Sequence, residues 1–478
     1  MRAALVAAVA CGAAVTVAAR RVAGFRPPVV APEAADLDGL DADAAAGRLA
    51  ELVRIPTVSS KDPAEIDAAA FARFRERLVE LYPQTHRVLE REVLGDGALL
   101  YRWAGGSDAP PMVLMAHYDV VPVGGQDWSR DPFSGLIEDG VVHGRGAIDD
   151  KGALVAILEA VESLVAEGFT PARDVYLSFG NDEEVFGVCA QLAVETLTSR
   201  GVRPWAVLDE GGAVVSGVFP GVPGSTAVVG LAEKGLVDVE LVTRDPGGHA
   251  SAPVRGGAPA RLARAILRIE DDPFPARLHD VVLGMVDALG RHAPTGYRAV
   301  FAHAQYLRPV LALLLSRASR EANALVRTTV AITQLEGSKA RNVLATRARA
   351  HANIRIALGE TVQSTVDRLR RVIDDPSVEL DVVAGNDPSP VSRADNEAFA
   401  LVSAAVHSVY PEAAVAPYVM VQASDARHFS QVCDSVYRFM PFDLSTAELA
   451  TLHAADERIS VAALHRGAGF FRYLLRNL

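Results

Sequence analysis

A chain of 478 residues is longer than one hydrophobic core usually supports, so we expect at least two domains. Its net charge of −12 argues against a nucleic acid, and against an anionic membrane surface, as a binding partner. Cys11, Cys189 and Cys433 are too few and too scattered for a disulfide framework or a thiolate metal site.

The first 25 residues predict a signal peptide or a membrane anchor. Ala3–Ala19 is an apolar run of small residues between Met1–Arg2 and Arg20–Arg21. A secretory signal has this pattern, whereas a retained anchor would explain the basic pair after the run. A buried helix of the fold is the third interpretation. We therefore expect an exported or membrane-anchored, extracytoplasmic protein, in which residues 26–42 form a Pro- and Ala-rich linker.

Helices and strands alternate from residue 43 to residue 230. The run Met112–Met115 has the length and composition of a buried parallel strand. Further strands are expected at Val175–Phe179 and Ala206–Leu208, and helices at Ala42–Arg54, Glu65–Leu81 and Lys151–Glu167. This alternation predicts an α/β fold with a mostly parallel sheet.

At about Leu231 the pattern changes to that of an α+β domain. Leu236–Val242, Thr329–Leu335 and Ala348–Ile356 alternate as strands with one exposed face, and Val362–Ile373 has helical spacing. The long segment Ala260–Ala324 between them is largely helical. Residues 231–388 therefore predict a domain inserted into a catalytic domain made of residues 43–230 and 389–478.

Histidine and acidic residues follow three successive predicted strands. His117 and Asp119 follow the first strand, Glu183 and Glu184 the second, and Asp209–Glu210 the third. Ligands of open α/β sheets bind beyond the carboxyl ends of the strands, so these side chains predict one shared site.

The residue types at this site predict a pair of metal ions. Two metals about 3.5–4 Å apart need a bridging carboxylate, for which Asp149 is the natural candidate. The expected ligands are His117 and Glu210 for one metal, and Glu184 and His453 for the other, with Asp209 as an alternative to Glu210. Imidazole and carboxylate ligands suit Zn²⁺, although Co²⁺ or Mn²⁺ would also fit.

Two further acidic residues have expected roles at the site. Asp119 can hold the His117 ring in one tautomer. Glu183, adjacent to a ligand, can act as the general base on water. Each motif alone is ordinary, since His-x-Asp is often a surface turn and Asp-Glu-Glu often a solvated loop. Their order after successive strands favours a catalytic site.

Six motifs occur in the order MAHYDVVP, GRGAIDDKG, NDEE, LDEGG, GGHASAP and LHAADERIS. With these motifs the chain resembles the dinuclear zinc amidohydrolases of the aminoacylase and carboxypeptidase group, which include succinyl-diaminopimelate desuccinylase. Within that group it is most similar to carboxypeptidase S (Gly-X carboxypeptidase) and the secreted N-fatty-acyl-amino-acid synthase/hydrolases. The resemblance extends from about Asp43 to the C-terminus.

The resemblance implies the same metal ligands and further roles. It implies a cis peptide bond after Asp149, Glu183 as the catalytic base, and an inserted domain that acts as a lid or dimerises. His249 in that domain would stabilise the oxyanion, commonly across a dimer, and Asn342 and Arg427 would contact the substrate.

We therefore expect metal-dependent hydrolysis of an amide or peptide bond next to a C-terminal free amino acid. The substrate would be an N-acyl amino acid or a short peptide whose carboxylate binds Arg427, and the apolar run Leu311–Leu315 could hold an acyl tail. The alternatives are an aminopeptidase- or dipeptidase-type exopeptidase and, in another class, a catalytically dead binding protein. The dead relative would lack a ligand or the base, whereas here all are present.

Overall fold

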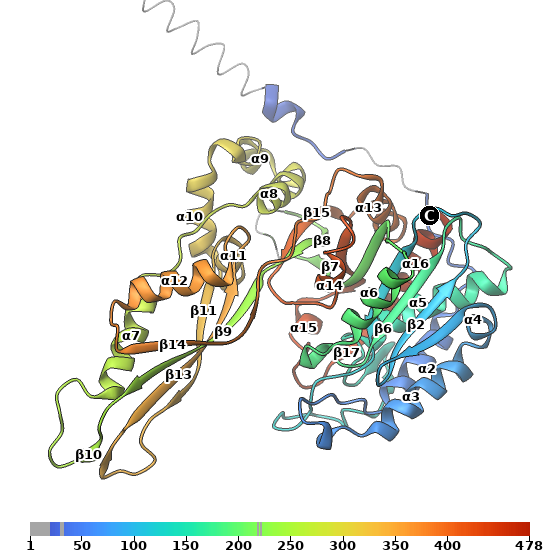
Figure 1. Cartoon of the computed structure of the whole chain (residues 1–478). Helices are drawn as coiled ribbons and strands as arrows, with labels where there is room; N and C mark the ends of the chain where they lie inside the picture. The colour runs from blue at the N-terminus through green and yellow to red at the C-terminus, as the bar shows by residue number, and fades with distance from the viewer. Residues whose placement is uncertain (1–19, 29–32, 218, 220–221) are drawn as a thin grey trace, which may run out of the picture.

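The computed structural model describes residues 20–28, 33–217, 219 and 222–478. Figure 1 shows a wide α/β body from which an elongated arm of strands and helices projects. The predicted leader falls mostly on residues 1–19, outside the described residues. Within the described residues, no helix combines the length and apolarity that crossing a bilayer requires.

The body is organised around an eight-stranded, mostly parallel sheet. From one edge to the other its strands are β1 (Glu90–Leu94), β2 (Ala98–Trp103), β6 (Val175–Gly180), β3 (Met112–His117), β7 (Ala206–Ser216), β16 (Val436–Leu444), β8 (Ser225–Glu233) and β15 (Ala414–Met420). The four central strands, β6, β3, β7 and β16, are parallel, as are β8 and β15. The antiparallel strands β1 and β2 complete the opposite edge. The predicted α/β fold is confirmed.

Helices cover both faces of this sheet. On one side lie α3 (Ala68–Leu81), α5 (Lys151–Ala166), α13 (Glu397–Val409) and α16 (Val461–Arg476), with α2 (Ala42–Val53) and α4 (Pro83–Val88) packed against α5. On the other side lie α6 (Cys189–Ser199) and α14 (Ala426–Phe429). Leu114 of β3 belongs to the first core, whereas Val113 and Met115 belong to the second. Because β3 is buried on both faces, its sequence is a continuous apolar run.

The arm is the inserted α+β domain. Its antiparallel sheet has the order β11 (Thr329–Glu336), β13 (Arg347–Ile356), β9 (Gly235–Arg244) and β14 (Val378–Asn386), packed against α7 (Ala258–Asp271) and α12 (Val362–Ile373). Val237, Val239 and Leu241 alternate inward from β9 to form its core. A two-stranded sheet of β10 (Gly248–His249) and β12 (Val343–Leu344) forms the tip, far from the body in Figure 1.

One part of the inserted segment packs on the body instead of on the arm. It comprises α8 (Asp280–His292), α9 (Thr295–Phe301), η3 (Ala304–Tyr306), α10 (Arg308–Ala318) and α11 (Arg320–Val326). Met285 and Leu289 of α8 belong to the core of the body, next to β15. This differs from the expectation that residues 231–388 form one separate domain, because the segment leaves the arm after α7 and returns at β11.

Short elements near the catalytic face connect distant parts of the chain. β4 (Leu136–Glu138), β5 (Val141–His143) and β17 (Arg458–Ser460) form a three-stranded sheet. This sheet places the segment before Asp149 beside the segment after His453. The remaining short helices are η1 (Pro63–Glu65), η2 (Glu183–Val185) and α15 (Thr446–Leu449).

Candidate metal centre

Asp149 lies at the centre of the predicted ligand set. Its Oδ1 is 3.0 Å from Nε2 of His117, and its Oδ2 is 3.0 Å from Nε2 of His453. The His453 nitrogen is also 3.2 Å from Oε2 of Glu184, and the His117 nitrogen is 3.6 Å from Oε1 of Glu210. The structure thus brings all five predicted ligands together in two groups, with one oxygen of Asp149 facing each group.

His117 is fixed from behind by Asp119, chiefly through the backbone carbonyl oxygen of that residue. The Nδ1 atom of His117 lies 3.0 Å from the backbone carbonyl oxygen of Asp119 and 3.4 Å from its carboxylate. This contact makes Nδ1 the donor and leaves Nε2 facing the centre. The Asp119 carboxylate instead accepts the backbone N–H groups of Glu183, at 3.2 Å, and Glu184, at 3.1 Å. Asp119 therefore aligns two site segments at once.

The geometry distinguishes Glu210 from Asp209. β7 continues through both residues, and successive side chains of a strand point to opposite faces. The Asp209 carboxylate accepts the backbone N–H of Ala426 at 2.8 Å, on the side of α14. Glu210 is the residue that lies beside His117.

The centre contains more carboxylates than the two histidines beside them can neutralise, so it is suited to bind cations. Burial raises the pKa of Glu184, and it raises the pKa of Glu210 to about 8, with a further contribution from the charge of Asp149. The pKa of His453 rises to about 10 through hydrogen bonds to Asp149 and Glu184. The buried Oε1 of Glu184 has no hydrogen-bond partner among the described residues. A bound cation would satisfy this atom and replace the proton on the imidazole.

Asp150 also lies in this cluster, although it was not a predicted ligand. Its Oδ2 accepts the backbone N–H of His117 at 3.2 Å, and burial raises its pKa well above the usual range. The Asp149–Asp150 peptide bond is cis, as the resemblance implied. We assign Asp150 to positioning β3, because its carboxylate already bonds the strand's backbone.

Glu183 is buried in η2, next to the candidate ligand Glu184. Burial raises the pKa of Glu183 well above its usual range, and the negative charge of Glu210 adds to the shift. A carboxyl group with a raised pKa beside a metal centre can accept a proton and return it. This environment is compatible with the predicted role of general base.

Glu457 and Arg145 support the centre, although their contact could not be predicted from the sequence. The Glu457 Oε1 accepts the backbone N–H groups of Ile148, at 2.9 Å, and Asp149, at 3.1 Å. Its Oε2 pairs with Arg145 at 2.6 Å, and both side chains are fully buried. The pair therefore fixes the backbone that carries the Asp149 carboxylate. Both residues lie in quoted motifs, but 312 positions separate them.

Arg427 lies on the catalytic side of the body. Its guanidinium donates to the carbonyl oxygen of Ser424 at 2.9 Å and stacks over Phe186, with 5.3 Å between the guanidinium carbon and the ring centroid. Phe186 ends the turn that contains Glu183 and Glu184. The structure thus places Arg427 beside the η2 segment of the centre.

His249 and Asn342 lie elsewhere. Both are exposed at the tip of the arm, where the backbone N–H of Ala250 donates to the carbonyl oxygen of Asn342 at 3.1 Å. Figure 1 shows this tip separated from the body. Within one chain, the structure does not bring these two residues to the other site residues.

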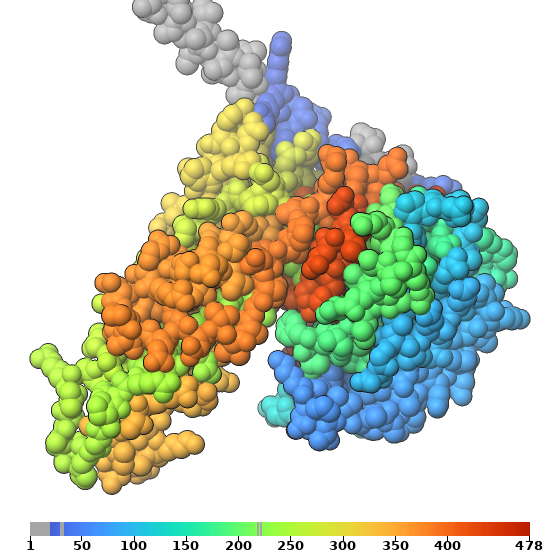
Figure 2. Space-filling model, viewed as in Figure 1, coloured from blue at the N-terminus to red at the C-terminus, as the bar shows by residue number. Residues whose placement is uncertain are grey.

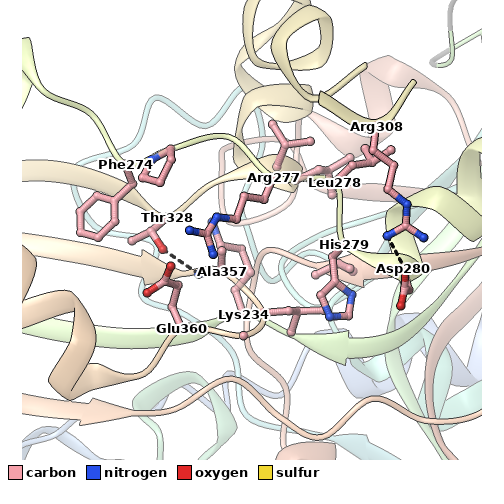
Figure 3. A pocket seen from close by; sticks show the side chains of 16 residues that line it. Lys234, Phe274, Arg277, Leu278, His279, Asp280, Arg308, Thr328, Ala357 and Glu360 are labelled. Atoms are coloured by element: carbon pink, nitrogen blue, oxygen red, sulfur yellow. Dashed lines mark hydrogen bonds and ion pairs between the residues drawn. The ribbon is translucent and has the colours of Figure 1, made fainter. Parts of the chain in front are cut away.

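A separate cavity of about 290 Å³ lies where the arm joins the body. Figure 3 shows its wall, to which Lys234, Phe274, Arg277, Thr328 and Glu360 contribute. The buried Nζ of Lys234 donates to the carbonyl oxygens of Ala324, at 3.0 Å, and Arg327, at 2.8 Å, and burial lowers its pKa to about 7. No predicted ligand lines this cavity, so it is distinct from the metal centre.

Comparisons with known proteins identify the family of the chain. A family model described as Peptidase family M20/M25/M40 matches residues 113–477. The chain is 33% identical over 440 residues to a probable carboxypeptidase S-like protein of Dictyostelium discoideum, with 90% of this chain and 84% of that protein covered. It is 35% identical over 434 residues to the N-fatty-acyl-amino acid synthase/hydrolase of Xenopus tropicalis, with 89% and 84% covered.

Solved structures show the same fold. An M20 family metallo-carboxypeptidase of Sulfolobus solfataricus has a TM-score of 0.68 at 18% identity, with 90% of this chain and 98% of that chain covered. Human carnosine dipeptidase 1 has a TM-score of 0.61 at 17% identity, with 91% and 96% covered. The resemblance inferred from the six motifs is therefore confirmed. The chain belongs to peptidase family M20/M25/M40 and is a metal-dependent hydrolase of amide or peptide bonds, of the carboxypeptidase and aminoacylase type.

Proposed function

We propose that this enzyme releases a C-terminal amino acid from N-acyl amino acids or short peptides, with two Zn²⁺ ions as its cofactors. The observation that carries the two-ion proposal is the position of Asp149, whose two oxygens face separate histidine and glutamate groups. His117 and Glu210 would hold one ion and Glu184 and His453 the other. The relatives named carboxypeptidase S-like and N-fatty-acyl-amino acid synthase/hydrolase support this substrate class.

The proposed mechanism divides the chemistry between the ions and the chain. When bound, the two ions would polarise the substrate carbonyl and lower the pKa of water to about 7. The Glu183 carboxylate would take the proton of the attacking water and deliver it to the nitrogen of the leaving amino acid. Its burial suits this double role, because a raised pKa lets the carboxyl group hold the proton between the two transfers.

Arg427 would bind the free carboxylate of the substrate. A guanidinium matches a carboxylate with two parallel hydrogen bonds. Phe186 and the Ser424 carbonyl oxygen hold this guanidinium beside the η2 turn, where the leaving amino acid would lie. Asp425, whose Oδ1 is 3.8 Å from the Arg427 guanidinium, helps to orient it.

His249 would donate a hydrogen bond to the oxyanion of a second chain. We propose a homodimer formed through the arm, because His249 lies at the arm's tip while the metal ligands lie in the body. Asn342 pairs with the same turn and would contact the substrate from the same side. The leader sequence supports export or membrane anchoring.

A substrate panel combined with metal analysis tests the proposal. The enzyme should bind two metal ions per chain, and activity lost with a chelator should return with Zn²⁺. N-acyl amino acids with a free carboxylate should be cleaved with a kcat/KM many-fold above that of their amides, because an amide leaves the partly buried Arg427 without its charge partner. Equal values for acids and amides would contradict the role of Arg427 and favour an enzyme acting at the amino end. One ion per chain at full activity would contradict the paired centre.

A further inference from the structure

The helix α10 presents an apolar face to solvent. Val310, Leu313 and Leu314 are 47–58% exposed, and Arg317 continues the same face at the spacing i, i+3, i+4, i+7. On the opposite side, Leu311 and Ala312 are buried against the body. The Leu311–Leu315 run was expected to hold an acyl tail. The structure instead divides it between the core and the surface.

The elements before α10 expose two tyrosines. Tyr297 of α9 and Tyr306 of η3 are both exposed, together with Val300. Tyrosine has an apolar ring and a polar tip, which suits the boundary between water and lipid. We call α9, η3 and the Val310–Leu314 face of α10 the α9–α10 surface.

The charge around this surface is opposite to that of the whole molecule. Residues 288–320 contain no Asp or Glu, but five arginines lie there. Arg291 and Arg308 pair with Asp287 and Asp280, at 2.8 and 2.7 Å, whereas Arg298, Arg317 and Arg320 have no carboxylate partner among the described residues. The net charge of −12 argued against an anionic membrane as a partner of the chain as a whole. Locally, however, a cluster of arginines beside apolar side chains favours anionic lipid.

The chain leaves the body at the same surface. Arg21 lies over the Tyr306 ring, 5.4 Å from its centroid. Phe25 is buried beneath Arg291, whose guanidinium carbon lies 4.8 Å from the Phe25 ring centroid. These contacts fix residues 20–26 against α8 and η3, and Figures 1 and 2 show them beside this end of the body. In the sequence, the apolar run Ala3–Ala19 immediately precedes Arg20.

We propose that the α9–α10 surface lies on the anionic lipid bilayer that holds the chain's own Ala3–Ala19 segment. This proposal rests on membrane anchoring, one of the two fates that the leader sequence supports. The apolar side chains of α10 enter the headgroup region and the tyrosines lie at its boundary. Arg298, Arg317 and Arg320 pair with lipid phosphates, so that the body rests on the membrane in one orientation.

A fluorescent label that reports contact with lipid tests the proposal. The full-length Cys11→Ser/Leu314→Cys protein would carry an environment-sensitive dye at position 314, since Cys189 and Cys433 are buried. The matched control is Cys11→Ser/Val383→Cys, because Val383, 61% exposed on β14, is as accessible as Leu314. In vesicles of phosphatidylglycerol and phosphatidylcholine with a lipid-borne quencher, the dye at 314 should be quenched severalfold more than the dye at 383.

A second label separates this proposal from that of the leader. A dye on the natural Cys11 reports whether the Ala3–Ala19 segment enters lipid. Quenching at position 11 without quenching at 314 would overturn the proposed lipid contact of the α9–α10 surface but would support the membrane anchor. Quenching at neither position would overturn both proposals.

Two results without vesicles would also overturn the lipid-facing assignment. If the dye at position 314 reports an apolar environment that disappears when the protein is diluted, a second copy of the chain covers the surface. If the apolar environment does not depend on protein concentration, the chain's own leader covers the surface. Arg317→Glu/Arg320→Glu should reduce quenching at 314 with phosphatidylglycerol, and unchanged quenching would contradict the role of the arginines.

Discussion

Glu183 and Glu184 are neighbours in one short turn, yet they have different surroundings. The Glu184 carboxylate lies 3.2 Å from His453. The pKa of Glu183 is raised chiefly by burial and by the negative charge of Glu210. We expect Glu183→Gln to keep the metal content of the wild type and to lose about 10²–10⁴-fold in kcat. Glu184→Gln is the matched control and should lose metal. The opposite result, with metal lost only from Glu183→Gln, would exchange the two roles.

Glu457 acts on the centre through the backbone of Asp149. Glu457→Gln keeps the shape but weakens the contact with Arg145 and with the N–H groups of Ile148 and Asp149. Support of this kind is typically worth about 10–100-fold in metal affinity. Competition with a chelator should show that loss in Glu457→Gln, and the exposed Glu412→Gln should bind metal as the wild type does. A variant that loses thermal stability but keeps its metal affinity would show a purely structural role.

At the scale of elements, β7 shows why the sequence underestimates some strands. Only Ala206–Leu208 was predicted, but β7 continues to Ser216 through Gly211 and Gly212. A Cβ atom on Gly212 would lie 1.8 Å from the carbonyl oxygen of Val228. The glycine thus marks the close approach of another backbone, which a local pattern cannot distinguish from the end of a strand. Asp209 and Glu210 stayed alternatives for the same reason. Neither residue was assigned to a strand, so the alternation of side chains along a strand could not decide between them.

This close approach predicts a strong effect of a small substitution. Gly212→Ala must push apart β7 and β8, and overpacking of this kind typically costs about 1–3 kcal/mol or more. Gly47→Ala is the control, since nothing lies within 4 Å of its Cβ position and it is in the helix α2. Removing a helical glycine should instead stabilise the protein by about 1 kcal/mol. Equal free energies of unfolding in urea for both variants would contradict the close approach.

Contacts between distant segments account for the other differences between the structure and what the sequence predicts. The gathering of the five candidate ligands could be predicted because each follows a recognisable strand or motif. Arg145 and Glu457 could not be paired, since nothing in the sequence indicates which distant segments meet. Likewise, the helices α8–α11 lie between two arm segments in sequence, and only the structure shows that Met285 packs on the body. The short edge strands β1 and β2 were also not predicted.

At the scale of the whole molecule, the junction between arm and body contains the buried amino group of Lys234. The pKa of Lys234 falls from 10.5 to about 7, because burial disfavours its charged form. Between these values the unfolded chain binds more protons than the folded one, so stability rises with pH by at most about 1.4 kcal/mol per unit. The free energy of unfolding of the wild type, relative to that of Lys234→Met, should therefore increase from pH 7 to pH 10. With the exposed Lys61→Met it should stay flat, and a flat difference for Lys234→Met would contradict a depressed pKa.

The separation of His249 from the metal centre gives a prediction about the assembled enzyme. His249→Ala should lose about 10²–10³-fold in kcat, as expected for one oxyanion donor. If His249 acts in the other chain of a dimer, mixing His249→Ala with Glu183→Gln restores intact sites. Free exchange of equal amounts would place about a quarter of all sites in the intact combination, so that fraction of the wild-type activity should return. Exchange is checked with mass-tagged chains, and a mixture that exchanges without recovering activity would show that the arm closes over its own body.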